Sequence, residues 1–158
     1  MSRQPASFPK EVMERFQFLV DDHGLEGPDY SELLLPSVSY GGTGLRIGTY
    51  FHDDSRESAG RTISVSISLD TERGAVHADL AELVGAVTFA LRHRVAWKAH
   101  TADAMRSTLD DNATWVRRLL PILQAPDALD TVRNSARHPT DKAGNPKRRR
   151  PDIKWKYG

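Results

Sequence analysis

The sequence contains no cysteine, which excludes disulfide bonds and thiolate metal sites and fits a reducing compartment. It also has no apolar run close to the roughly 18 residues that a membrane-spanning helix needs. The opening residues, MSRQPASFPKEVMERF, lack the apolar segment of a secretory signal. These absences predict a cytoplasmic protein that does not associate with membranes.

What the chain does contain is typical of a globular protein. Of its 158 residues, 39% are hydrophobic and 27% are charged, which is enough apolar material for one domain with its own core. The net charge of +1 hides an asymmetry, because residues 138–158 hold seven Lys or Arg and two Asp, whereas residues 1–137 hold fifteen basic and nineteen acidic residues. We therefore predict an α+β domain over residues 1–137 and a basic C-terminal arm over residues 138–158, and the asymmetry suggests that the arm binds a partner.

The first predicted element is a helix from about Pro9 to His23. Its apolar residues recur at three- and four-residue steps, and Gly24 is suited to end it. The segment after it, LEGPDYSE, predicts an acidic loop rich in turn-forming residues.

Three strands are predicted next, at LLLPSVSY (33–40), LRIGTYFHDD (45–54) and RTISVSISLD (61–70). The third is the clearest, because its aliphatic residues alternate with serine and threonine, as in a strand with one buried and one hydrated face. Pro36 places the first strand at an edge or a bulge. Since consecutive strands usually pair, we expect a three-stranded antiparallel meander.

The remaining periodicity is helical. Asp79 and Glu82 resemble a capping box at the start of a helix that continues toward Trp97. A second helix begins near Thr101, with Pro121 expected to kink or end it, and a short third helix begins near Pro126. The predicted fold class is thus α+β: an N-terminal helix, a three-stranded meander, and two to three C-terminal helices on one sheet face.

No motif in the chain carries a catalytic or metal-binding signature. The stretch GGTG lacks the residues of a phosphate-binding loop and precedes a strand rather than a helix. His93 and His100 are seven residues apart, which is wider than the usual helical zinc spacing. We expect no catalytic residue, no metal ion and no cofactor.

Two acidic loops and one strand face are the candidate protein-binding residues. The loops could form a negative surface that steers a basic partner, and the hydroxyls of the third strand could form a contact face. An alternative is that these residues are charged or polar simply because they are hydrated. The candidates are Asp21, Asp22, Glu26, Asp29, Asp53, Asp54, Ser64, Ser66 and Ser68.

The basic arm supports a second hypothesis, nucleic-acid binding. It combines cations with aromatic rings, which suits phosphate contacts and base stacking on RNA or single strands. The residues are Lys147, Arg148, Arg149, Arg150, Lys154, Trp155, Lys156 and Tyr157. Two alternatives stay open: the arm is merely solvated, or Ile153, Trp155 and Tyr157 pack on the acidic body or on a partner.

Three stretches carry a resemblance, namely RFQFLVDDHGL, PSVSYGGTGLRIGTYFHDDSRESAGRTISVSISL and NATWVRRLLPIL. Over about residues 8–125 they resemble a loose group of small actinobacterial proteins of unknown function, some of which resemble immunity proteins of polymorphic toxin systems. The resemblance implies a cytoplasmic binding module that neutralises or holds another protein, for example a basic nuclease. It does not extend to the basic arm.

The leading hypothesis from the sequence is therefore a non-enzymatic protein–protein interaction module with a basic partner. The alternative is a nucleic-acid-associated protein that acts through the arm. The sequence does not indicate an oligomeric state.

Overall fold

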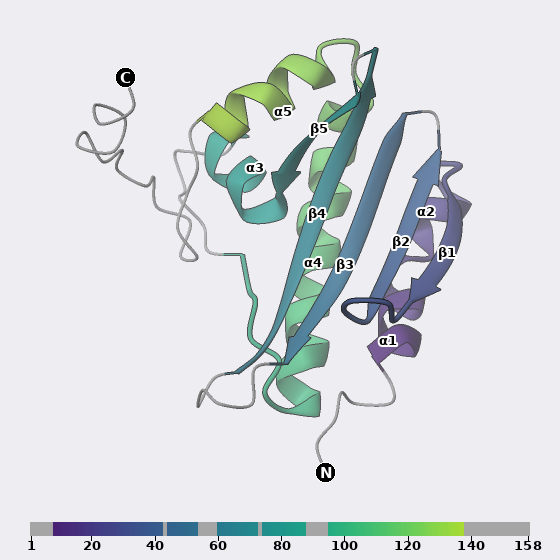
Figure 1. The fold of residues 1–158 in the computed structure, drawn as a ribbon, viewed down its shortest axis with the longest axis vertical. Coiled ribbons are helices and arrows are strands. Elements are labelled where there is room, and N and C mark those ends of the chain that lie inside the picture. The colour runs from purple at the N-terminus through teal and green to yellow at the C-terminus, as the bar shows by residue number, and fades with distance from the viewer. Residues whose placement is uncertain (1–7, 43, 54–59, 73, 88–94, 138–158) are drawn as a thin grey trace, which may run out of the picture.

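The structure, a computed structural model, describes residues 8–42, 44–53, 60–72, 74–87 and 95–137. Helices α1 (Phe8–Phe16) and α2 (Phe18–Asp21) precede five strands, and α3 (Leu80–Val87), α4 (Ala102–Leu123) and α5 (Ala128–Arg137) follow them. The strands are β1 (Glu26–Ser31), β2 (Ser37–Gly42), β3 (Leu45–Asp53), β4 (Arg61–Thr71) and β5 (Gly74–Asp79). All four pairings are antiparallel in the order β1-β2-β3-β4-β5, so the sheet is a continuous meander (Figure 1).

The core lies between one face of this sheet and the helices. Alternate residues of β4, from Ile63 to Leu69, are buried, and their partners on β3 include Phe51 and Ile47. Helix α4 runs behind the middle of the sheet in Figure 1, while α1 and α2 lie behind β1 and β2. Because one face of each central strand is apolar, the helices cover that face and leave the other uncovered. The predicted α+β class with an antiparallel sheet is confirmed.

The sheet has two more strands than the sequence predicts. The three predicted strands are the centre of the sheet, and β1 and β5 extend it at its two edges. The segment LEGPDYSE, predicted as a loop, contains β1, and the first predicted strand begins only at Ser37 rather than at Leu33. Glycine, proline and aspartate are poor strand formers, so β1 forms because β2 offers a hydrogen-bonding edge, not because of its own propensity.

A glycine makes the pairing of β1 with β2 sterically feasible. At Gly27 the backbone has φ +135°, and a Cβ there would lie 2.8 Å from the carbonyl oxygen of Ser39. Only glycine tolerates both this backbone conformation and this close approach of the two strands.

The helices differ from the prediction at three points. The helix expected from Pro9 to His23 is divided into α1 and α2, and the helix from Leu80 does not extend to Trp97, because residues 95–97 are not helical. Helix α4 passes through Pro121 and ends two residues later, since buried leucines on its last turns hold it against the core. The capping box is confirmed in part: the Asp79 N–H donates to Glu82 Oε1 at 2.9 Å.

Helix α4 begins where the sequence predicts, near Thr101, and the segment before it explains one polar feature of the core. Thr101 caps the helix by accepting a hydrogen bond from the Ala104 N–H at 2.9 Å. The buried Asn112 donates to the carbonyl oxygen of Ala96 at 3.0 Å. The Ile63 N–H in turn donates to the carbonyl of Trp97 at 2.7 Å, so this segment continues the sheet beside β4 where β5 ends.

Within the parts of the chain that the structure describes, no helix combines the length and apolar character that crossing a membrane requires. The basic arm, residues 138–158, lies outside the described residues.

Candidate functional site

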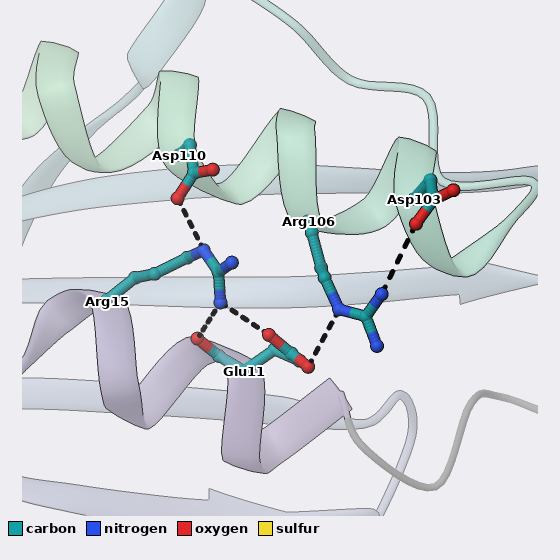
Figure 2. Close-up of polar contacts among 5 residues, drawn as sticks. All are labelled: Glu11, Arg15, Asp103, Arg106 and Asp110. Carbon is teal, nitrogen blue, oxygen red and sulfur yellow. Dashed lines mark hydrogen bonds and ion pairs between the residues drawn. The ribbon is translucent and has the colours of Figure 1, made fainter.

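Charged residues of α1 and α4 form one matched cluster. Figure 2 shows Glu11 on α1 between two arginines: Arg15, one turn further along α1, and Arg106 on α4. Arg106 Nε lies 3.1 Å from Glu11 Oε2, and Arg15 Nε lies 2.6 Å from Asp110 Oδ1. Arg106 also contacts Asp103 at 3.3 Å. Because every charge in this cluster has an opposite partner, it joins the two helices and leaves little net field for a ligand.

The pKa of Glu11 shows how closely this cluster is matched. Burial alone would raise the pKa of the Glu11 carboxyl, but the hydrogen bonds from Arg106 and Arg15 outweigh burial and hold it below its ordinary value. The same contacts, from Asp110 and Glu11, raise the pKa of Arg15 against the effect of burial. The cluster is therefore stable as a set of ions at neutral pH and serves the fold.

The serine face of β4 lies where the sequence predicted it. Ser64, Ser66 and Ser68 are half-buried on the face opposite the core, which the helices leave uncovered. Ser64 Oγ lies 2.9 Å from His52 Nε2 on β3, and Ser68 Oγ lies 2.7 Å from His77 Nδ1 on β5.

A hydroxyl beside an imidazole is the beginning of a nucleophilic site, but a catalytic serine also needs donors that stabilise an oxyanion. Ser64 and Ser68 lie on a regular interior strand, whose N–H groups serve the sheet rather than an oxyanion. Ser68 lies directly opposite His77, and Ser64 lies diagonally across from His52, as expected for cross-strand contacts that stabilise a sheet. We read both pairs as structural.

The acidic candidates do not form one surface. Asp21 and Asp22 at the end of α2, and Glu26 and Asp29 on β1, are all exposed and lie along one edge of the molecule. Asp53 is at the far end of β3, where Arg61 Nε lies 3.6 Å from it. Asp54 lies outside the described residues. The structure therefore separates the two predicted acidic loops and pairs part of the second.

The edge that holds the first group also exposes apolar side chains. Leu33 and Leu34, between β1 and β2, are 93% and 94% exposed, and Tyr30 on β1 is 38% exposed. These are the large hydrophobic residues that stand out as exposed among the described residues. Single exposed leucines are ordinary, but two adjacent ones at this exposure are apolar surface that contact with another molecule would stabilise.

We define the β1–β2 edge as residues 21–36, which comprise the end of α2, strand β1 and the connection to β2. From Phe16 to Leu45 the sequence has five acidic residues and no Lys or Arg, so the charges of this edge lack basic neighbours along the chain. Tyr30 Oη donates to Glu32 Oε2 at 2.8 Å. Burial, the larger cause, and the Glu32 carboxylate both raise the pKa of Tyr30. Strand β1 ends the sheet, and within the described residues its outer side has no pairing strand. The edge thus combines a free strand, acidic charge and an apolar tip.

The described residues offer no alternative built around a metal ion. Among them, no group of three or more His, Asp or Glu side chains is arranged to hold one. All eight nucleic-acid candidates of the basic arm, from Lys147 to Tyr157, lie outside the described part of the chain, so that hypothesis stays a prediction.

Comparison of the chain with protein-family models, with curated proteins and with solved structures finds no match in any of the three. The resemblance to small actinobacterial proteins therefore stays a prediction.

Sequence reasoning missed the apolar part of the β1–β2 edge. The sequence predicts a strand that includes Leu33 and Leu34, because a leucine run before Val38 and Tyr40 is typical of one. The available signal was Pro36, which separates the leucines from the alternating residues that follow.

Proposed function

We propose that the protein is a non-enzymatic protein–protein interaction module that binds a basic partner through the β1–β2 edge. The observation that carries the proposal is the exposure of Leu33 and Leu34 beside a sheet edge that is free within the described residues. Burying two such leucines contributes about 1.5–3 kcal/mol each, which is the scale of interface hot spots.

The charge of the edge determines which partner fits. Glu26 and Asp29 lie on β1 itself, so a strand or loop that approaches the edge meets two carboxylates. Acidic partners are repelled and basic ones are attracted, which raises both selectivity and association rate. An immunity-like role, in which the module holds a basic nuclease, has this chemistry and is the form of the proposal that the resemblance favours.

The test compares two charge reversals that change net charge equally. The full chain, with Asp29→Lys or with Glu72→Lys, is used to capture proteins from the source organism, and any protein that is captured is purified and titrated by calorimetry. Glu72 is exposed at the β4–β5 connection, next to the other edge of the sheet.

We expect one defined protein to bind the wild type and the Glu72→Lys variant equally and the Asp29→Lys variant at least about tenfold more weakly. Equal weakening by both variants would mean that only the overall charge matters. Recovery of nucleic acid in place of a protein would favour the alternative function of the basic arm.

A further inference from the structure

We infer that residues 152–157 of the same chain occupy the free side of β1 as a sixth strand when no partner is bound. This inference rests on the proposed function, because it assigns an internal competitor to the same edge. It therefore adds regulation to that site: a partner must displace the chain's own strand.

The sequence of this segment has the period of a strand. In DIKWKY the apolar residues Ile153, Trp155 and Tyr157 alternate with Lys154 and Lys156. An extended chain therefore places the apolar side chains on one face and the ammonium groups on the other. The segment is long enough to pair with residues 29–31, the part of β1 that is in regular register with β2. This pattern favours pairing at the edge of a sheet over a solvated segment, because a solvated segment would leave three large apolar residues in water.

The two faces of β1 complement the two faces of this segment. Asp29 opposes Ser39 on β2, and that row continues through Gly48 to Ser66, so Asp29 shares the uncovered face with the serines. Tyr30 opposes the buried Val38 and therefore belongs to the helix-covered face. A sixth strand whose lysines lie beside Asp29 also places its apolar side chains beside Tyr30. The charged contacts and the apolar contacts therefore form in one register.

The length of chain between the last described helix and this segment is sufficient. Helix α5 ends at Arg137, and fourteen residues lie between Arg137 and Asp152, so the fifteen Cα–Cα steps span up to about 50 Å when extended. Crossing from β5 to a strand beyond β1 requires five strand spacings, or about 24 Å. One chain can therefore supply both strands, and a linker of this length gives an effective concentration in the millimolar range.

The absence of cysteine makes a direct test straightforward. Ser31 faces the uncovered side of β1, and Ala75 lies at the same face on β5, the opposite edge. We would prepare the full chain with Ser31→Cys or Ala75→Cys, each combined with Lys154→Cys or Lys156→Cys, and measure disulfide formation under mild oxidation. Helix α5 packs against β5, so an arm without a preferred site would react with Ala75→Cys at least as readily.

We expect a monomeric cross-link with Ser31→Cys at one of the two arm positions, in at least about tenfold greater yield than with Ala75→Cys. A yield that is equal at the two edges, or a disulfide-linked dimer as the main product, would overturn the inference.

A second measurement guards against variants that fold poorly. In the wild-type full chain, the backbone amides of residues 153–157 should exchange with deuterium at least about tenfold more slowly than in an unstructured peptide of the same sequence. The substitutions Lys154→Glu and Lys156→Glu should abolish this protection. The matched pair Lys147→Glu and Arg148→Glu, with the same charge change outside the strand, should leave it intact. Unprotected amides in the wild type would contradict the inference.

The outcomes separate this inference from the proposed function. If the cross-link forms but no partner depends on Asp29, the internal strand stands and the binding function falls. If a partner depends on Asp29 but the cross-link does not form, the reverse holds. If both stand, Lys154→Glu with Lys156→Glu should raise the apparent affinity for the partner, by about tenfold where the strand is docked in 90% of molecules.

Discussion

Charged side chains of α1 and α4 form ion pairs, whereas no ion pair joins a carboxylate of the β1–β2 edge to another described residue. Glu11 is 13% exposed and contacts two arginines, while Glu26 and Asp29 are exposed on a strand with no Lys or Arg in the surrounding thirty residues. The apolar residues differ in the same way: those of α1 are in the core, and Leu33 and Leu34 are in water. Groups that are satisfied within the chain serve its stability, and groups that are left unsatisfied at one place are available to bind another molecule.

The largest effect should come from the apolar part of the unmatched region. Replacing Leu33 and Leu34 by serine should weaken binding of the captured partner about 100-fold, since each leucine loses its burial in the interface. Because both side chains contact little in the free protein, the melting temperature should stay unchanged.

Calorimetric titration and thermal unfolding of the same preparations measure the two quantities. Glu72→Ser, at the connection on the other edge, serves as the control. A fall in stability that accompanied the loss of binding would break the comparison, because the leucines would then belong to the fold.

The next largest effect concerns the matched region. Glu11→Lys should lower the free energy of unfolding by about 2 kcal/mol, because it leaves a third cation between Arg15 and Arg106. Asp103→Lys should cost far less, since the Asp103 side chain is 96% exposed and makes one contact with Arg106. Denaturant unfolding of both variants measures the difference. Similar losses would show that burial does not distinguish these two carboxylates.

A smaller effect is expected at an unsatisfied group inside the core. Tyr40 on β2 is buried, and among the described residues its hydroxyl has no hydrogen-bond partner. Tyr40→Phe should therefore raise the free energy of unfolding by about 1 kcal/mol. Denaturant unfolding measures it, and a loss of stability would mean that the hydroxyl is hydrogen-bonded in solution.

The pH dependence of the same variant sharpens this result. Burial raises the pKa of Tyr40 to about 12, above the ordinary value of 10. The native state therefore holds its proton more tightly than the unfolded state, and this stability is lost as pH rises from 10 to 12. The wild type should lose more stability than Tyr40→Phe over that interval.

The smallest effect is the acid response of the matched cluster. The pKa of Glu11 in the folded protein lies below its ordinary value of 4.5, so its contribution is present above pH 4.5 and is lost as pH falls through the lower folded value. Glu11→Gln should consequently lose less stability than the wild type between about pH 5 and pH 3. Equal slopes of unfolding free energy against pH would show that the arginines do not stabilise the carboxylate.

The sequence by itself determined the elements whose periodicity is strong. The alternation from Ile63 to Leu69 identifies β4 and its buried face, and Thr101 identifies the start of α4, because both signals arise from neighbouring residues. The same local reasoning placed Ser64, Ser66 and Ser68 on the uncovered face. It also placed Asp21, Asp22, Glu26 and Asp29 in one exposed group.

Only the tertiary structure decided the rest. Strand β1 has the wrong residues for a strand and exists because β2 presents an unpaired edge to it, and the exposure of Leu33 and Leu34 follows from where that pairing ends. Arg106, the partner of Glu11 on α4, is 95 residues away in the sequence, and no spacing rule reaches across that distance. Pairings between distant segments depend on how the sheet and helices pack together, which is why the matched and the unmatched charges of this protein look alike in its sequence and differ in its structure.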